Sequence, residues 1–370
     1  MLRTAASGVG MLVLAAALSL ASPAPAQVLE PLPEGTGQPG NLLGPDDAPA
    51  KPQAWQAQRV EMPASPVRIL APGSGLAKLA SVRILTEGGD VYSLASCATG
   101  ICANKVTATY EEPRLPDGAL PGSRLTSGRA RIRHAWLADP TRRLGASAIG
   151  AWVAGALVVE DDATREHRLQ LPLDQAFEDT EPRLVELDAD GTPSVVAVRS
   201  SLDRGASLVV ARLEGEGLLR IAAETPPLGR PHAWLNPIGF GDVDGDGRLD
   251  IVVVVSPDDG GRLQVLDLEG TSFRTRYDLK GVSNHVPGTM TARLGVIADF
   301  DGDKVLDVAV PSGDRTRLRI LSFRGGAVAE PASVELPAPI VTEVVGIAGK
   351  GGERPFLVMG LADGSLQLVH

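Results

Sequence analysis

The sequence predicts an all-β fold on the basis of three observations: short apolar runs, frequent turn residues and an internal repeat. Runs of Val, Ile and Leu, four to eight residues long, recur from about residue 60 to the C-terminus, as in SVRILT, SLVVARL, DIVVVVS and RLRILSF. Each run is bounded by Gly, Asp, Pro or Ser, which is typical of strands joined by tight turns. The 42 Gly, the 29 Pro and an aromatic content of 4% also favour short strands over a helical domain.

The repeat is about 50 residues long and predicts a β-propeller. Its three copies are PRLVELDADGTPSVVAV at 182–198, GFGDVDGDGRLDIVVVV at 239–255 and GVIADFDGDKVLDVAVP at 295–311. Aligned on their first aspartates, the copies are 54 and 57 residues apart (242 − 188 and 299 − 242). Such a period holds about four short strands, the content of one propeller blade, and a single blade cannot bury both faces of its sheet. We therefore expect a β-propeller of six blades, with seven left open and a β-helix as the structural alternative.

The last blade is expected to need a strand from the N-terminal end of the domain. The stretch 341–370 is too short to supply a whole blade. In many propellers an N-terminal strand completes the last blade, which closes the ring. We expect PVRILAP at 66–72 to pair with the C-terminal SLQLVH in this way.

The N-terminus predicts export. Arg3 supplies a positive start, Gly10 to Ala21 an apolar core of 12 residues, and Ala24-Pro25-Ala26 the small residues that signal peptidase accepts. The apolar core is shorter than the roughly 20 residues that a membrane span needs, and an uncleaved anchor is the alternative interpretation. We therefore expect residues 1–26 to be a signal peptide, and the mature protein to be periplasmic or secreted and not membrane-spanning.

The remaining chain divides into a linker and the repeat domain. Residues 27–58 contain six prolines among Gly, Ala and acidic residues and have no apolar periodicity. This composition predicts an extended, flexible linker. Residues 59–370 contain the strand-like runs and are expected to form the propeller of repeats.

Both cysteines lie in the short stretch SCATGICAN, as Cys97 and Cys102. Because export exposes the chain to an oxidising compartment, the favoured interpretation is a local disulfide that joins two strands. A zinc site would need further soft ligands nearby, and a redox-active pair usually has a tighter spacing.

The charge of the chain argues against polyanionic partners. The formal net charge is −10, and no cluster of basic residues offers a phosphate-binding face. We therefore expect neither nucleic acid nor an anionic membrane surface as a partner. The partner that we expect is a protein or a glycan.

The second copy of the repeat contains the spacing D-x-D-x-D-G-x-x-D, which predicts a calcium site. Carboxylates at alternate positions of a tight loop can point to one centre, and the glycine allows the backbone to turn with positive φ. Several hard oxygen ligands suit Ca²⁺, whereas Mg²⁺ requires stricter octahedral geometry. The predicted ligands are the side chains of Asp242, Asp244, Asp246 and Asp250 and the backbone carbonyl of Arg248. The alternative is a solvated turn held by the aspartates' own hydrogen bonds.

The other two copies keep this pattern to different extents. In the third copy the predicted ligands are Asp299, Asp301, Asp303 and Asp307 and the backbone carbonyl of Val305. Lys304 occupies the place of the turning glycine there, and its side chain is strained if φ is positive. The first copy keeps Asp188 and Asp190 but has no closing acid, so we expect a turn without a metal.

These residues resemble the FG-GAP or VCBS repeat, the blade motif of the integrin alpha-subunit propeller and of many exported bacterial proteins. The resemblance is carried by GFGDVDGDGRLDIVVVV, by 294–311 and, in a degraded form, by 182–198. It implies a propeller, commonly of seven blades, with calcium in loops that join outer and inner strands. The ligands that it implies are the ten residues named above, and in this family calcium is usually structural.

Catalytic motifs are not evident in the sequence. There is no G-x-S-x-G nucleophile elbow, and the five histidines are dispersed without an H-x-x-x-H pair. We therefore expect a calcium-binding propeller that acts as a non-catalytic binding or scaffold protein of the cell envelope. The alternative is a secreted or periplasmic hydrolase or lyase that acts on polysaccharide, since two distant acids could meet across a cleft. Trp55 and Trp152 could serve as sugar-stacking platforms.

Overall fold

The computed structural model describes residues 54–370 apart from 74, 99, 108–113, 188–192, 216 and 352. These residues lie in one compact unit, Gln53–His370. The predicted signal peptide and most of the predicted linker lie outside the described residues. Within the described part of the chain, no helix is long and apolar enough to cross a membrane.

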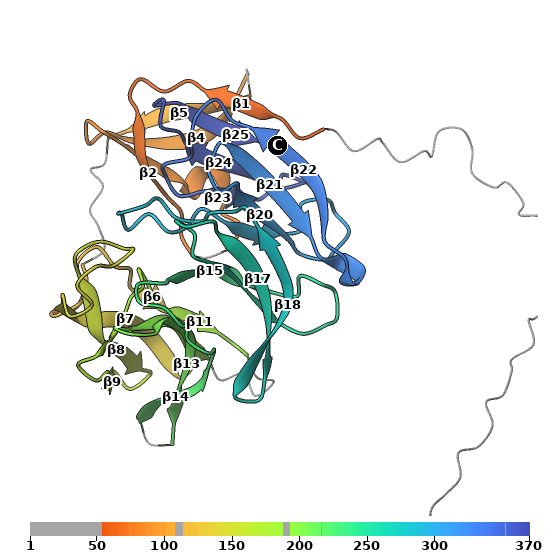
Figure 1. Ribbon diagram of the computed structural model, residues 1–370. Helices are drawn as coiled ribbons and strands as arrows, with labels where there is room; N and C mark the ends of the chain where they lie inside the picture. Colours follow the sequence, from red (N-terminus) through yellow and green to blue (C-terminus); the bar gives the residue numbers. More distant parts are fainter. Residues whose placement is uncertain are drawn as a thin grey trace, which may run out of the picture. The chain divides into compact units, whose positions relative to one another are not determined.

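The described residues form 25 strands, arranged in five antiparallel sheets, and two 3₁₀ turns (Figure 1). The first sheet contains β2 (Pro66–Leu70), β3 (Arg83–Thr86), β4 (Val91–Cys97) and β5 (Gly100–Val106). The second sheet contains β15 (Leu235–Gly241), β16 (Asp250–Val255), β17 (Arg262–Glu269) and β18 (Ser272–Lys280). The third contains β19 (Val296–Ala298), β20 (Asp307–Pro311), β21 (Arg317–Ser322) and β22 (Ala329–Glu335). In each, consecutive strands are neighbours, which is a simple meander. The 3₁₀ turns are η1 (Leu79–Ser81) and η2 (Arg324–Gly326).

The fourth sheet has nine strands because one short strand joins two meanders. The first meander contains β6 (Thr126–Ser127), β7 (Ile132–Thr141), β8 (Val153–Asp161) and β9 (Glu166–Gln170). The second contains β11 (Arg183–Val185), β12 (Ser194–Ser201), β13 (Gly205–Glu214) and β14 (Leu218–Glu224). Strand β10 (Gln175–Phe177) pairs with both β8 and β12 and so links them.

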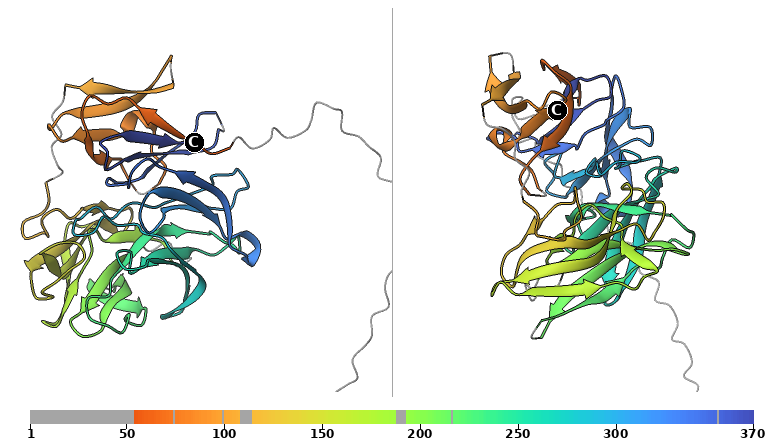
Figure 2. Two further views of the ribbon diagram at one scale, coloured as in Figure 1. Left: turned by 45° about the horizontal axis from the view of Figure 1, so that its top comes forward. Right: turned by 90° about the vertical axis from the view of Figure 1, so that its left-hand side faces the viewer.

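The last sheet is completed by a strand from the N-terminal end of the described chain. It contains β23 (Val345–Ile347), β24 (Phe356–Gly360) and β25 (Leu366–Val369), and β1 (Ala57–Val60) pairs antiparallel with β25. Figure 2 shows these orange and dark blue strands side by side. The pairing therefore resolves six four-stranded units among the described residues, four as separate sheets and two within the nine-stranded sheet.

The prediction of which strand closes the last sheet was wrong. The stretch 66–72 forms β2, which begins the first meander by pairing with β3. The strand that closes the last sheet is β1, which begins two residues before the predicted start of the repeat domain at residue 59. In β1 only Val60 is buried, so these four residues lack the alternation of apolar and polar side chains that marks a strand in sequence.

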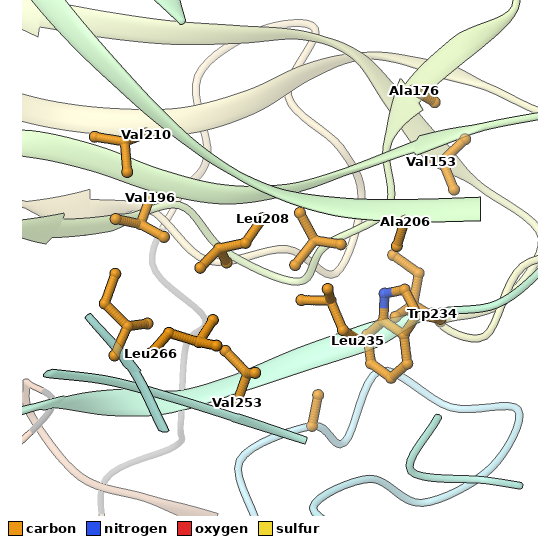
Figure 3. Close-up of a cluster of buried hydrophobic side chains, with 14 of the residues drawn as sticks. Val153, Ala176, Val196, Ala206, Leu208, Val210, Trp234, Leu235, Val253 and Leu266 are labelled. Atoms are coloured by element: carbon orange, nitrogen blue, oxygen red, sulfur yellow. The ribbon is translucent and has the colours of Figure 1, made fainter. Parts of the chain in front are cut away.

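The apolar cores lie between neighbouring sheets, as the stacking of blades requires. One cluster joins the nine-stranded sheet to the β15–β18 sheet and includes Leu208 and Val253 (Figure 3). Val252 and Val308 belong to the cluster between the β15–β18 and β19–β22 sheets. Further clusters join β19–β22 to the last sheet and the last sheet to β2–β5. Four-stranded meanders packed face to face, with the last one closed by the N-terminal strand, make the fold a β-propeller.

Candidate metal centre

The two aspartate loops occupy equivalent places in neighbouring sheets. The first connects β15 to β16 and the second connects β19 to β20. In each loop the last aspartate of the motif, Asp250 or Asp307, is the first residue of the second strand. That strand is a buried apolar run, so its packing holds the closing carboxylate in place at the end of the loop.

Three carboxylates converge in each loop. One oxygen from each of Asp242, Asp244 and Asp250 lies within 4.8 Å of the others, and the same holds for Asp299, Asp301 and Asp307. Each of these two aspartate triads, as we name them, could therefore hold one metal ion. The sequence predicted all six residues as ligands.

Backbone amides fix the first aspartate of each loop. The Oδ1 and Oδ2 atoms of Asp242 accept hydrogen bonds from the amides of Gly245 (2.8 Å) and Gly247 (2.9 Å). The oxygens of Asp299 accept in the same way from Gly302 (2.6 Å) and Lys304 (3.0 Å). The hydrogen bonds that the turn interpretation expected are therefore present in both loops, and the triad forms within the same turn.

The closing aspartates each retain a buried oxygen without a hydrogen-bond partner. Both side chains are fully buried. The Oδ2 atom of Asp250 accepts from the amide of Val243, and that of Asp307 from the amide of Phe300, each at 3.0 Å. The Oδ1 atoms of both residues have no hydrogen-bond partner. Because a buried, unsatisfied carboxylate oxygen is costly, this arrangement fits a bound cation.

Burial also changes the acidity of the closing aspartates. It raises the pKa of Asp250 to about 7, and the neighbouring carboxylates of Asp267 and Asp244 act in the same direction. It raises the pKa of Asp307 to about 6, while the amide of Phe300 opposes the shift. Burial near other carboxylates disfavours a negative charge at both positions, and a bound cation would offset this cost.

The third aspartate of each motif lies outside the triad. The carboxylate of Asp246 accepts hydrogen bonds from the backbone amide of Arg248 (2.9 Å) and from its guanidinium (2.9 and 3.1 Å). Asp303 accepts from the amide of Val305 (2.8 Å) and from Nη1 of Arg324 (2.6 Å). In this structure, arginines therefore hold the two carboxylates that were predicted as further ligands.

The lysine in the second loop adopts the backbone conformation of the glycine that it replaces. The φ angle is +72° at Lys304 and +82° at Gly247. The amide of each residue donates to the first aspartate of its loop, as described above. The predicted strain at Lys304 is therefore present, and the loop keeps the shape of the first one despite it.

A fourth carboxylate near the first triad was not predicted. The register that pairs Ile251 with Leu266 brings Asp267 of β17 beside Asp250. The side chain of Asp267 is buried, and its Oδ2 accepts from Nη2 of Arg248 at 2.9 Å. Asp267 could not be identified from the sequence, because its position beside the triad depends on strand register rather than on spacing within the loop.

The two loops contact each other directly. The amide of Leu306 donates to the backbone oxygen of Asp242 at 3.4 Å. The side chain of Val305 lies so close to Gly245 that an added Cβ atom there would be 3.3 Å from Cγ2. Because of these contacts, the backbone of one loop supports the other.

The family comparison matches both loops. Residues 187–253 and 242–310 each match the FG-GAP-like repeat family. Residues 187–310 are FG-GAP-like repeats. The two aspartate triads lie within this segment, and the predicted resemblance is thereby confirmed for it.

Two further comparisons concern the whole chain. The comparison with curated proteins gives no match. Among solved structures, the chain is similar to the WD40 domain from Toxoplasma gondii coronin. The identity is 11%, the match covers 85% of this chain and 86% of that one, and the TM-score is 0.35.

Outside the repeats, the structure joins Cys97 and Cys102 as a disulfide. The bond connects β4 and β5, which are paired in this region.

Proposed function

We propose that the protein is an exported, calcium-binding β-propeller that acts as a non-catalytic binding or scaffold protein of the cell envelope. The observation that carries this proposal is the pair of aspartate triads at equivalent strand entrances of the FG-GAP-like repeats. Carboxylate oxygens are the ligands that Ca²⁺ prefers, and both triads contain a buried oxygen that no protein group satisfies. The signal peptide that the sequence predicts at residues 1–26 supports export.

In this proposal, calcium acts on the loops and not on a reaction. When bound, the ion supplies positive charge at two sites where like charges otherwise repel one another. Each triad would hold one ion. The amides of Gly245 and Gly247 would orient Asp242, and those of Gly302 and Lys304 would orient Asp299. Ion binding would then make the loops rigid, because the ion binds only the folded conformation of each loop.

Calcium titration tests the metal assignment. We expect mature protein freed of metal to bind about two Ca²⁺ ions in calorimetry and to gain thermal stability. A site at one hundred times its Kd contributes about 2.7 kcal/mol to the free energy of unfolding. We expect D250N and D307N each to remove one site, because each substitution deletes the buried charge and keeps the side-chain volume.

The control variant is D314N. Asp314 accepts hydrogen bonds from Ser312 and Thr316 in a turn between β20 and β21 and belongs to neither triad. This variant should bind the same number of ions as the wild type. If addition of a chelator leaves the melting temperature of the wild-type protein unchanged, the metal assignment fails.

A screen of ligands and activities tests the binding role. Trp152, which immediately precedes β8, is 43% exposed, and Cζ of Arg142 lies over its ring at 4.3 Å from the ring centroid. An exposed aromatic ring of this kind suits contact with a glycan or a protein. We expect saturable binding to a glycan or an envelope protein without turnover, whereas cleavage of a polysaccharide would support the enzymatic alternative.

A further inference from the structure

A pocket lies at the end of the β15–β16 hairpin that is farthest from the first aspartate triad. The segment 230–234, which precedes β15, and the loop 256–259, which follows β16, form most of its wall, and Ala148 adds to it from the loop between β7 and β8. The hairpin pairs Leu235 with Val255 at this end, and the aspartate loop lies at the other end. The pocket is therefore a site separate from the metal centre.

The pocket has the size of one small ring. Its volume is about 160 Å³, and a cavity of about 150 Å³ can hold one benzene molecule. Trp234, which is 3% exposed, forms its floor; the indole N–H donates to the carbonyl of Glu178 at 2.8 Å, and the ring lies 4.9 Å from that of His285. The exposed residues Arg230 and His232 stand at the rim, so the pocket opens to solvent.

The wall of the pocket offers both hydrogen-bond donors and acceptors. Within the described part of the chain, Arg230 makes its hydrogen bonds through Nη2 alone, to Oγ of Ser256 (3.3 Å) and Oδ2 of Asp259 (3.0 Å), so its other N–H donors are available. Nδ1 of His232 lies 3.2 Å from the carbonyl oxygen of Ala146, to which it donates, and this leaves Nε2 of the neutral ring as an acceptor. Hydroxyl groups, which both donate and accept, suit such a wall.

The charged groups of the pocket are paired. Both carboxylate oxygens of Asp258 lie 2.9 Å from Nδ1 of His285, whose Nε2 donates to the carbonyl of Thr289 at 2.8 Å. The contact of Nδ1 with Asp258 therefore requires a second proton, and the pair is neutral overall whichever group holds it. Arg230 and Asp259 form a second pair at 3.0 Å. This balance favours a neutral ligand, and the side chain of Asp258, 29% exposed, can still accept from it.

Two residues of the wall hold left-handed backbone conformations. The φ angle is +58° at His232 and +50° at Ser256. The amide of Ser256 donates to the carbonyl of Trp234 at 2.8 Å, and the amide of Ala233 to that of Arg230 at 3.3 Å, which fixes both turns. Residues other than glycine adopt such conformations rarely, and strain of this kind is typical of ligand sites. It therefore supports a binding role for the pocket.

We propose that this pocket binds one neutral pyranose unit of a glycan. The ring would fill the pocket with an apolar face against Trp234, as in sites that combine an aromatic surface with a few placed polar groups. Its hydroxyl groups would accept from Arg230 and donate to Asp258 and His232. The inference rests on the proposed role as a binding protein and narrows its ligand to a glycan.

Matched ring compounds test the class of ligand. We expect at least one of the methyl glycosides of glucose, galactose, mannose and N-acetylglucosamine to bind the mature protein saturably, as measured by saturation-transfer NMR and calorimetry. Tetrahydropyran-2-methanol keeps the ring, lacks the ring hydroxyl groups and should not bind. Equal binding of this compound would show recognition of the apolar ring alone and would overturn the proposal.

Two variants of the rim test the place of binding. R230Q should weaken glycoside binding by about tenfold, because it removes a charged hydrogen-bond donor. Its melting temperature should stay that of the wild type, since the Arg230 and Asp259 side chains are 58% and 77% exposed. H232N should weaken binding by about threefold or more, and asparagine tolerates the positive φ angle. The control is R274Q, because Arg274 forms a similarly exposed pair with Glu269 on the same sheet; it should bind as the wild type does.

The outcomes separate the pocket from the binding role. Glycoside binding that is unchanged in both R230Q and H232N would mean that the sugar binds elsewhere, which overturns the pocket assignment and still supports a glycan-binding protein. Absence of binding by all four glycosides would also overturn the pocket assignment. The binding role would then depend on the envelope proteins in the ligand screen.

Discussion

At the scale of single residues, the two aspartate loops form a natural comparison, because they have similar backbones and only one of their three sequence differences, Gly247 against Lys304, replaces a glycine. Gly247 and Lys304 both have positive φ and both donate an amide hydrogen bond to the first aspartate of their loop. A side chain at such a φ angle costs roughly 1 kcal/mol, and glycine avoids that cost. The space around Gly247 is open, so backbone strain is the main difference between the two residues.

Exchanging these residues should therefore have effects of opposite sign. We expect K304G to raise the free energy of unfolding by about 0.5–1 kcal/mol and G247K to lower it by about 1 kcal/mol, both in the absence of metal. Urea denaturation measures both changes. K304G should also bind calcium more tightly, since it removes an ammonium group from the loop. Equal signs for the two variants would contradict this account of the loops.

The turn between β8 and β9 depends on another single residue. The buried carboxylate of Asp161 accepts hydrogen bonds from the amides of Ala163 and Arg165, each at 2.9 Å, and from the Arg165 side chain. Nε2 of His167 lies 2.8 Å from its Oδ2. The contact with His167, followed by those with Arg165, holds the pKa of Asp161 well below its usual range.

This shift predicts a pH-dependent loss of stability in D161N. A carboxyl group with a lowered folded-state pKa stabilises the protein fully above its unfolded-state pKa of about 3.9, and this contribution declines as the pH falls below that value. The stability difference between the wild type and D161N should thus be constant from pH 7 to 5 and shrink towards pH 3 in urea denaturation. The adjacent exposed Asp162 provides the control variant D162N. A difference that stays constant down to pH 3 would show that the charge of Asp161 is not responsible.

At the scale of elements, the sequence predicted what depends on local pattern and missed what depends on register. The alternation and turn residues predicted the strands of the meanders, and the aspartate spacing predicted all six residues of the triads. The spacing could not reveal that Asp246 and Asp303 would be held by arginines, since Arg324 reaches Asp303 from another turn. Asp267 was missed for the same reason, because only the pairing of β16 with β17 brings it beside Asp250.

One element departs from the regular repeat. Strand β10 has only three residues, yet it pairs with β8 and β12 and merges two meanders into one sheet. The buried residues Ala176 and Phe177 belong to two different apolar clusters. In a strand, successive side chains point to opposite faces of the sheet. The same strand therefore contributes to the core on both faces.

At the scale of the whole molecule, the match to the FG-GAP-like repeat family spans residues 187–310, and meanders continue on both sides of it. The units outside this segment keep the strand order without the aspartates. The ion pair of Arg124 with Glu343, which is 2.7 Å long, belongs to this scale as well, since the two residues precede strands of different meanders and no local spacing connects them. Sequence alone could predict the units, but not the residues that the stacking of units brings together.

Strand β1 completes the last sheet. Residues Ala57 to Val60 pair with β25, and Gln56 and His370 exchange two backbone hydrogen bonds of 2.9 and 3.1 Å. Val60 is 3% exposed and belongs to the core between the last sheet and β2–β5. Deleting residues 27–60 should therefore lower the free energy of unfolding by about 2–4 kcal/mol, from the lost apolar burial and backbone pairing.

The matched control for this deletion removes residues 27–53 and leaves β1 intact. We expect this shorter deletion to change the free energy of unfolding by less than about 0.5 kcal/mol, because the prolines and polar residues of the predicted linker cannot bury apolar surface. Urea denaturation of both deletions and of V60D distinguishes the contribution of the strand from that of the linker. V60D should resemble the longer deletion, since a charged side chain cannot replace Val60 in the core. Equal stability of the two deletions would mean that the last sheet is stable without β1 and that closure by the N-terminal strand contributes little.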